Sequence, residues 1–170
     1  FMTAPSRKAA DLVAKLKAKS ATSRDDVIDE LVALGSASVP PLVKALAHKD
    51  YKVRMAAAQA LGGIRNEDAI NALILTLSDS STNAQEAAAE ALTKIGPPAV
   101  SALLDALIGK DQSARRWAAE ALGSIGDESV AAELVARLSD ANIEVQRAVV
   151  TALGALRSKK AIQPLIGVLS

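Results

Sequence analysis

Apolar residues recur along this chain with a long, regular period. A leucine returns every 30 or 31 residues, and a second apolar residue follows each of the first five leucines by 18 residues. The leucines are Leu16, Leu46, Leu77, Leu107, Leu138 and Leu169, and the residues that follow them are Leu34, Ile64, Ile95, Ile125 and Leu156. Periods of this length are typical of repeat proteins built from one supersecondary unit per repeat. Two apolar anchors in fixed register predict one helical hairpin per repeat.

The spacing of apolar residues within each repeat, and the prolines and capping residues between them, also favour helices. In the second repeat, apolar residues lie at offsets of 0, 3, 4, 7, 8 and 11 from Val53, which places them on one face of a helix. Pro40 and Pro41 follow Ser38, and proline is tolerated in a first helical turn. Short polar residues that can cap the free N–H groups precede the second helices of three repeats, at Asp50, Asp111 and Asn142.

The pattern predicts an all-α fold, a right-handed α-α superhelix or α-solenoid, with five helix pairs and a final unpaired helix. We expect one domain over residues 1–170. The expected repeats span approximately residues 5–35, 36–65, 66–96, 97–126 and 127–157, with a half repeat over 158–170.

The two ends of the array differ. Asp26 and Glu30 stand where the second repeat has Ala56 and Ala60, so the first repeat should present a polar cap to solvent. Residues 159–169 keep a fully apolar helical pattern without a second helix to cover it. Either the repeat array continues beyond this end, or the chain associates with itself through this helix.

Three segments carry a family resemblance: VRMAAAQALGGI (53–64), ARRWAAEALGSIGD (114–127) and AIQPLIGVL (161–169). They resemble HEAT-like repeats of the phycobilisome (bilin) lyase type, a family whose members serve as lyase subunits, adaptors and scaffolds. The resemblance implies an α-solenoid of HEAT-like hairpins. Gln85 and Gln146 depart from it, because they replace the arginine that the family usually has at this position. Any Asp–Arg ladder along the array should therefore be interrupted.

Composition excludes several classes of function. The chain has 20 basic and 19 acidic residues, so it lacks the positive field that binding to nucleic acid usually requires. It has no cysteine, which excludes disulfides and thiolate chemistry. No apolar run is long enough to cross a bilayer, and no signal peptide is evident. We therefore expect a cytoplasmic protein that binds neither nucleic acid nor membrane.

The sequence offers no obvious catalytic or cofactor site. His48 is the only histidine, and it is expected in a turn, whereas a deoxyhypusine hydroxylase, which resembles this type of repeat, holds iron with several His–Glu pairs. The acidic cluster around Asp25 is explained more simply as part of the cap than as a metal site. Gly62, Gly63, Gly123 and Gly154 recur in register and predict close helix contacts rather than a phosphate loop. We expect no catalytic residue, metal or cofactor.

Positions that differ between repeats are free to specialise in binding. On the second helices, one outward column reads Asp25, Met55, Glu86, Arg116 and Arg147, and the next reads Asp29, Gln59, Glu90, Glu120 and Thr151. Solenoids commonly bind partners on the concave side, which these columns should line. The columns begin acidic and end with arginine, so they predict a groove that orients an elongated partner. Its expected contacts are Tyr51, Met55, Gln59, Glu86, Glu90, Arg116, Trp117, Glu120 and Arg147.

Trp117 is open to two interpretations: the indole could stack on a nucleic-acid base, for which the chain lacks a basic groove, or it could pack within the protein. It occupies a column that is alanine at Ala56, Ala87 and Ala148, so the indole is expected to pack partly between repeats. An edge of the ring could also reach a protein partner, because tryptophan and arginine are favoured interface anchors.

The sequence thus favours a noncatalytic scaffold or adaptor that binds a protein partner on the concave face. The alternative, implied only by the family resemblance, is a bilin lyase subunit or phycobiliprotein-associated factor that acts with a partner subunit.

Overall fold

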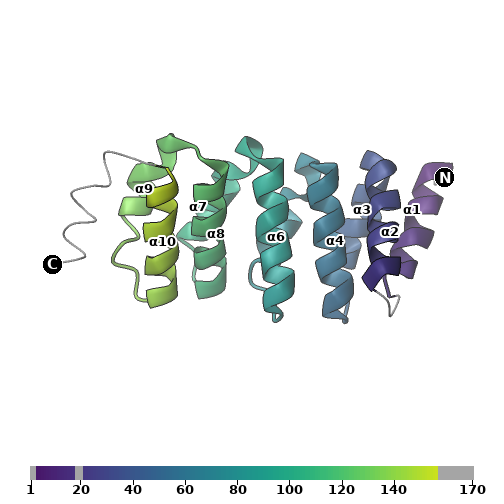
Figure 1. Ribbon diagram of the computed structural model, residues 1–170, viewed down its shortest axis with the longest axis horizontal. Coiled ribbons are helices and arrows are strands. Elements are labelled where there is room, and N and C mark those ends of the chain that lie inside the picture. Colours follow the sequence, from purple (N-terminus) through teal and green to yellow (C-terminus); the bar gives the residue numbers. More distant parts are fainter. Residues whose placement is uncertain (1–2, 18–20, 157–170) are drawn as a thin grey trace. The chain divides into compact units, whose positions relative to one another are not determined.

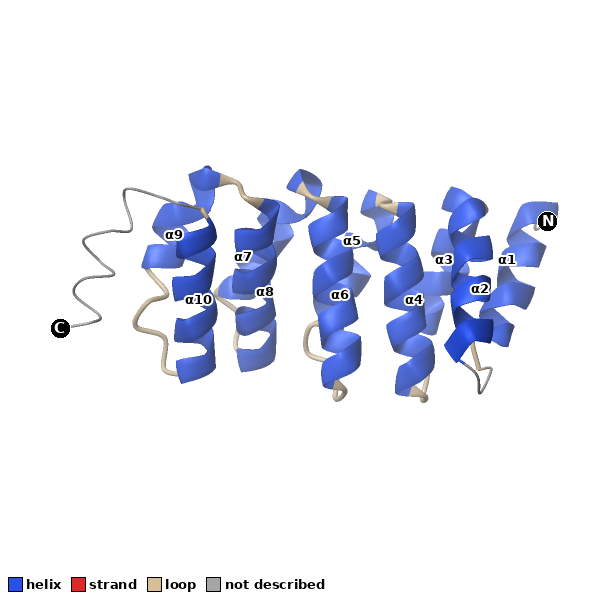
Figure 2. Ribbon diagram, in the orientation of Figure 1, coloured by secondary structure: helices blue, strands red, loops and turns tan. Residues whose placement is uncertain are grey.

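The computed structural model describes residues 3–17 and 21–156, which form helices joined by short turns (Figure 1). These described residues contain no strand (Figure 2). The predicted unpaired helix over residues 158–170, and with it the prediction of self-association through that end, lies outside the described residues.

The chain divides into two compact units, Phe1–Ile95 and Gly96–Ser170. A division between repeats does not decide whether the chain is one domain, so the single-domain assignment stays a prediction. The helices of unit 1 are α1 (Ala4–Lys15), α2 (Ala21–Ala33), α3 (Val39–Ala45), α4 (Tyr51–Ile64), α5 (Ile70–Thr76) and α6 (Thr82–Ile95). Those of unit 2 are α7 (Val100–Leu107), α8 (Gln112–Ile125), α9 (Ala131–Val135) and α10 (Ile143–Ala155).

Each unit consists of two helix layers. In unit 1 the second helices α2, α4 and α6 pack side by side, and α1, α3 and α5 lie behind them (Figure 2). In unit 2 α8 packs against α10, while α7 and α9 pack behind their own partners. Each predicted hairpin therefore contributes one helix to each layer.

The core follows the apolar ladder that defines the repeat. Leu16, Leu77 and Leu107 are fully buried, and so are alanines in the middle of the second helices, such as Ala57 and Ala118. Small side chains at these sites let the second helices approach closely, which the large side chains of an ordinary amphipathic helix would prevent.

Glycine marks the closest helix contacts. A Cβ added to Gly62 of α4 would lie 2.8 Å from Ala91 Cα of α6, and one added to Gly123 of α8 would lie 2.6 Å from Ala152 Cα of α10. Real Cβ atoms do not come this close to backbone carbon. The sequence-based prediction of a close helix contact is therefore confirmed at these two glycines. At the matching position of α10, a Cβ on Gly154 would meet no described atom within 4 Å.

Side-chain caps begin the second helices as predicted. Asp50 Oδ1 accepts from Lys52 N at 2.9 Å, and Asp111 Oδ1 accepts from Ala114 N at 2.8 Å. Asn142 Oδ1 accepts from Glu144 N at 2.9 Å and from Val145 N at 3.2 Å. Each bond satisfies an N–H that has no acceptor within its helix.

Replacing Asp111 by alanine should lower the free energy of unfolding by about 1 kcal/mol, because it removes the side-chain cap of α8. Urea denaturation followed by circular dichroism measures the change. Asp105→Ala, at an exposed position within α7, is the matched control and should change stability by less than about 0.5 kcal/mol. Equal effects of the two substitutions would contradict the capping role.

Short 3₁₀ turns precede four of the first helices, a feature that the apolar pattern does not predict. They span Gly35–Ser38, Glu67–Ala69, Pro97–Ala99 and Glu128–Val130. Ser38 ends the first of these turns, and its fully buried hydroxyl donates to Leu31 O at 2.8 Å. This bond ties the end of one hairpin to the start of the next.

Buried ion pairs connect neighbouring repeats within each unit. Arg54 Nε of α4 donates to Asp79 Oδ2 at 2.6 Å, and Arg115 Nε of α8 donates to Asp140 Oδ2 at 2.8 Å. A second nitrogen of each guanidinium reaches the other carboxylate oxygen, so both pairs are bidentate. Each arginine also binds carbonyls of the turn before its own helix, such as Gly109 O.

Two glutamines interrupt this ladder, as predicted. Gln85 Nε2 donates to Asp79 O at 2.5 Å, and Gln146 Nε2 donates to Asp140 O at 2.7 Å. Each glutamine therefore keeps the bond to the turn of its own repeat. Neither can form the charged bond to a carboxylate of the next repeat. In the sequence, Lys110 stands at the position that corresponds to Asp79 and Asp140.

The polar face predicted for the first repeat is present. Asp26 and Glu30 of α2 are exposed, whereas Ala56 and Ala60 at the matching positions of α4 are buried against neighbouring helices. Lys8 Nζ lies 3.8 Å from Glu30 Oε2, an exposed ion pair between α1 and α2.

Candidate functional site

The second-helix layer of unit 1 carries a shallow depression with mostly acidic walls, which we call the acidic hollow. Its volume is about 390 Å³. Residues of the two predicted columns line it from α2, α4 and α6, with small or apolar side chains and Lys94 beside them. The lining residues are Asp25, Ile28, Asp29, Val32, Gln59, Gly63, Glu90 and Lys94. Three carboxylates against one ammonium leave an excess of negative charge at this surface.

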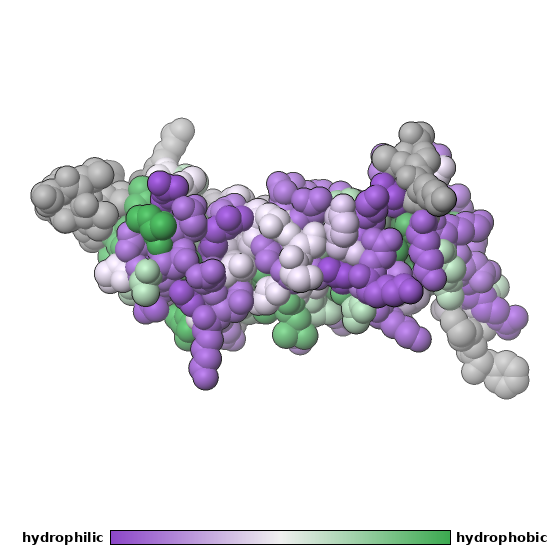
Figure 3. All heavy atoms as spheres, turned by 90° about the horizontal axis from the view of Figure 1, so that it is seen from below, coloured by the Kyte–Doolittle hydropathy of each residue, from purple (hydrophilic) through white to green (hydrophobic). Residues whose placement is uncertain are grey.

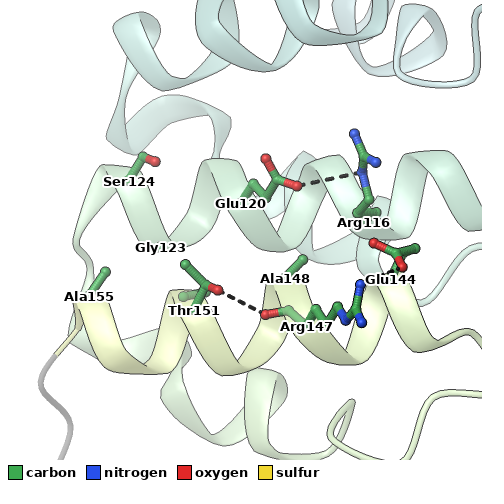
Figure 4. Close-up of a pocket in the computed structure, with 10 residues that line it drawn as sticks. Arg116, Glu120, Gly123, Ser124, Glu144, Arg147, Ala148, Thr151 and Ala155 are labelled. Carbon is green, nitrogen blue, oxygen red and sulfur yellow. Dashed lines mark hydrogen bonds and ion pairs between the residues drawn. The ribbon is translucent and has the colours of Figure 1, made fainter. Parts of the chain in front are cut away.

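A second depression, the arginine hollow, lies between α8 and α10 of unit 2 and has a volume of about 340 Å³ (Figure 4). Its floor consists of small residues because α8 and α10 meet closely at Gly123. Its walls carry the predicted Arg116, Glu120 and Arg147. The full lining is Arg116, Glu120, Gly123, Ser124, Glu144, Arg147, Ala148, Thr151, Ala152 and Ala155.

Both arginines of this hollow face a glutamate of their own helix. Arg116 Nε lies 3.5 Å from Glu120 Oε1, and Arg147 donates to Glu144 Oε1 at 3.0 Å (Figure 4). Arg116 and Arg147 thus lie in this hollow, but its charges are balanced by Glu120 and Glu144. A ligand would therefore have to replace these internal ion pairs, and a bare anion gains little there.

Trp117 lies beneath the wall of the arginine hollow rather than in it. The side chain is only 8% exposed, which confirms the expected packing of the indole into the core. The guanidinium carbon of Arg116 lies 4.2 Å from the ring centroid, a distance at which cation–π attraction orients the arginine. Trp117 thus bears on this surface by positioning Arg116.

The remaining predicted contacts do not line either hollow. Glu86 is exposed on α6 and Met55 is half-buried on α4. Tyr51, at the first residue of α4, is 39% exposed. Of the predicted set, the structure therefore brings together Gln59 with Glu90 in unit 1, and Arg116 with Glu120 and Arg147 in unit 2.

Three polar residues of the hollows were missed by the sequence reasoning. Lys94 and Ser124 each stand one helical turn beyond a predicted contact, Glu90 and Glu120 respectively, so extending the columns by one turn would have found them. Glu144 lies three residues before Arg147, a spacing at which helical side chains meet.

Neither hollow has the features of a catalytic or metal centre. Within residues 3–17 and 21–156, no three His, Asp or Glu side chains gather as metal ligands.

None of the helices in these ranges is long and apolar enough to cross a bilayer. Most of the surface is hydrophilic on the face in Figure 3, where hydrophobic side chains emerge in patches.

Two carboxyl groups with clearly lowered pKa values lie in the ion pairs between repeats, away from both hollows. Burial alone would raise the pKa of Asp79, but the hydrogen bonds from Arg54 and from Ser81 N outweigh it and lower that pKa. Asp140 follows the same pattern, with burial opposed by bonds from Arg115 and Asn142 N. These shifts reflect structural pairing rather than acid–base catalysis.

Comparison with solved structures shows the fold. A chain from the complex of CpcE and CpcF of phycocyanin lyase from Nostoc sp. PCC7120 is 22% identical, with a TM-score of 0.64, and the match covers 86% of this chain and 98% of that one. An engineered protein is 25% identical, with a TM-score of 0.51 and coverage of 95% and 85%. The crescerin structure, described as a TOG domain array that regulates microtubules in the primary cilium, is 17% identical, with a TM-score of 0.63 and coverage of 93% and 81%.

These solved structures confirm the predicted all-α solenoid class, and a chain of the phycocyanin lyase complex is among those that share the fold. No curated protein matches this chain. The family model for HEAT repeats matches residues 9–81, 39–115 and 100–170. Because these overlapping matches extend over most of the sequence, the chain belongs to the HEAT-repeat family.

Proposed function

We propose that this protein is a noncatalytic scaffold that binds a partner protein through its second-helix layer. One observation carries the proposal: the residues that line the two hollows differ from repeat to repeat, while the packing residues beneath them repeat. One surface position has glutamine in the second repeat (Gln59) and glutamate in the next two (Glu90 and Glu120). The buried position beside it is alanine in all three repeats: Ala60, Ala91 and Ala121. Shared positions maintain the helix packing, and divergent exposed positions are free to recognise a partner.

The charges of the hollows restrict the chemistry of the partner. Asp25, Asp29 and Glu90 would bind lysine or arginine side chains of a partner. The arginine hollow, with Arg147 72% exposed, would take a partner that offers a carboxylate to Arg147 and a donor to Glu144. A partner with a basic and a mixed-charge patch fits this protein better than nucleic acid, whose phosphates the acidic hollow would repel.

Similarity to a chain of the CpcE–CpcF complex supports a protein partner, since that protein was solved as an assembly of two named components. It also leaves a second candidate function, a lyase subunit that acts with another subunit on phycobiliproteins. The lyase-like neighbour covers 86% of this chain, but neither hollow holds an evident nucleophile or general base, so a partner would have to supply the chemistry.

The scaffold proposal is tested by affinity capture from the source cell with mass spectrometry, followed by binding measurements with the captured protein. Glu90→Lys and Arg147→Glu should each weaken binding at least about tenfold, because they reverse a charge at the contact. Glu133→Lys, a charge reversal at an exposed position of α9 in the first-helix layer, is the matched control and should leave binding unchanged.

Full binding by both charge-reversal variants would refute the hollows as the contact surface. If capture returns phycobiliproteins and a second subunit, bilin and the apo-phycobiliprotein should be added to the reconstituted pair. A change in bilin absorbance that requires this chain would then favour the lyase-subunit function over a purely structural scaffold.

A further inference from the structure

A third surface lies on the first-helix layer of unit 1, opposite the layer that holds the acidic hollow. It is a groove between α1 and α3 with a volume of about 620 Å³, which we call the outer groove. Alanine, valine and proline side chains form most of its lining. The lining residues are Ala10, Val13, Ala14, Lys17, Pro41, Lys44, Ala45, Ala47, His48 and Val53.

The α1 side of the outer groove is a second apolar stripe on a helix whose core-facing stripe is already buried. Ala9, Leu12 and Leu16 are buried in the core. Ala10, Val13 and Ala14 lie at offsets of 0, 3 and 4, so they share the neighbouring face of the helix, and Lys17 follows in the turn after it. Ala14 is exposed and Val13 is half-buried. No described residue of unit 1 fills the groove beside this stripe.

A neighbouring hollow extends the apolar surface to α5. It is lined by Val43, Leu46, Ala47, Ala72, Leu75, Thr76 and Asp79, and it shares Ala47 with the outer groove. Leu75 is 78% exposed, the largest exposed fraction among the exposed large hydrophobic side chains of the described residues. Apolar surface therefore runs across three neighbouring helices rather than ending in one closed pocket.

Among the residues that line this surface, the free charge is positive. The outer groove has two ammonium groups in its lining, at Lys17 and Lys44, both exposed. His48 lies beside them, and its Nδ1 accepts from Asp50 N at 3.0 Å. The carboxylate of the neighbouring hollow, Asp79, is only 9% exposed and is held by Arg54. Within the described residues neither lysine has an ion-pair partner, so an incoming carboxylate would not have to displace one.

We propose that the outer groove binds an amphipathic helix of a partner protein that has an apolar stripe and acidic residues on its flanks. Neighbouring packed helices lie about 8–10 Å apart, so the surface from α1 to α5 spans roughly 20 Å. A crossing helix would cover that span with about 13 residues. Apolar side chains at i, i+3 or i+4, and i+7 would enter the two hollows, and flanking carboxylates would pair with Lys17 and Lys44. This site is separate from the acidic and arginine hollows.

Two peptide display libraries screened against the full chain test the proposal. Both present helices of about 18 residues with a varied apolar stripe; one has glutamate on the flanks and the other has lysine. Peptides that bind the outer groove should come from the glutamate library alone. Their affinities, measured by fluorescence anisotropy, should fall at least tenfold with Ala14→Glu, Leu75→Glu or Lys44→Glu. All three positions are exposed, so circular dichroism should show unchanged folding.

Matched controls separate this site from the proposed scaffold surface. Ala136→Glu makes the same change at the register-equivalent exposed position of unit 2, and Glu90→Lys alters the acidic hollow. Neither should change peptide affinity. The proposal is overturned if the glutamate library yields no binder, if lysine-flanked peptides bind equally well and lose affinity with the same three variants, or if the selected glutamate-flanked peptides are insensitive to these variants. If Ala14→Glu fails to fold, Lys44→Glu and Leu75→Glu decide alone.

Discussion

Replacing Gly123 by leucine is expected to lower the free energy of unfolding by about 3 kcal/mol, the upper end of the usual cost of overpacking a close contact. The Cβ would lie 2.6 Å from Ala152 Cα and 2.7 Å from Ala152 Cβ. A neighbouring side chain could rotate away, but the nearest atom here belongs to the backbone of α10. The leucine therefore has to push α8 and α10 apart, which loosens the floor of the arginine hollow.

Denaturant unfolding monitored by circular dichroism measures this loss, and hydrogen exchange should locate it in α8 and α10. Gly154→Leu provides the matched control, since it makes the same substitution at the equivalent position, where no described atom lies within 4 Å. It should stabilise α10 by up to about 0.8 kcal/mol because glycine is a poor helix former. Similar losses at both glycines would show that the close approach of α8 to α10 is not what Gly123 permits.

Replacing Arg115 by alanine should lower the free energy of unfolding by about 3 kcal/mol, because it leaves Asp140 buried without its cation. The two side chains are only 15% and 6% exposed, so water replaces the lost bonds poorly. The turn carbonyls of Gly109 and Lys110 lose their donor as well. Arg115→Gln should cost less, since Gln146 shows that glutamine can keep the bond to the turn.

The exposed pair Arg147–Glu144 is the control for the Arg115 substitution. Its side chains are 72% and 51% exposed, so Arg147→Ala should change stability by less than about 0.5 kcal/mol.

The dependence of the free energy of unfolding on acidic pH offers a second measurement of the Arg115–Asp140 pair. Because the pKa of Asp140 is lowered on folding, its contribution is fully present above the unfolded pKa of about 3.9 and is lost as pH falls through the folded value. Asp140→Asn should remove that part of the acid sensitivity; equal acid sensitivity would contradict the assignment.

Much of the fold could be predicted because the same apolar pattern recurs in each repeat. A single leucine does not indicate a structure, but six leucines in register define the helical hairpin. Residues that differ from the repeat pattern at a given position then become informative. The acidic positions Asp26 and Glu30 indicated an end of the array, and Gln85 and Gln146 indicated breaks in the ladder. The 3₁₀ turns escaped prediction because segments of three or four residues are too short to show a helical period, although each ends on a buried residue in register with the repeat. Local side-chain caps begin two of the four turns, where Asn66 Oδ1 accepts from Asp68 N and Asp127 Oδ1 accepts from Ser129 N.

The sequence could predict which residues of the candidate site lie on the outward face of the second helices, but not which of them line a hollow. The register placed Glu90 and Arg116 on the outward side of the second helices. Whether a position lines a hollow depends on its neighbours, which is why Glu86 and Met55 lie outside both hollows although they share a column with Arg116. The outer groove was invisible to the pattern because alanine serves both the core and the surface here. Ala57 is fully buried, whereas Ala14 and Ala47 are exposed.

The placement of Trp117 gives unit 2 an optical reporter of its own. It is the only tryptophan in the chain, so intrinsic indole fluorescence arises from this one site. The ring lies beneath Arg116, and Arg116 forms part of the wall of the arginine hollow. A ligand that draws the guanidinium away would change the environment of the indole, so occupancy of that hollow can be followed by emission without a label. Binding confined to the outer groove of unit 1 would leave the signal silent.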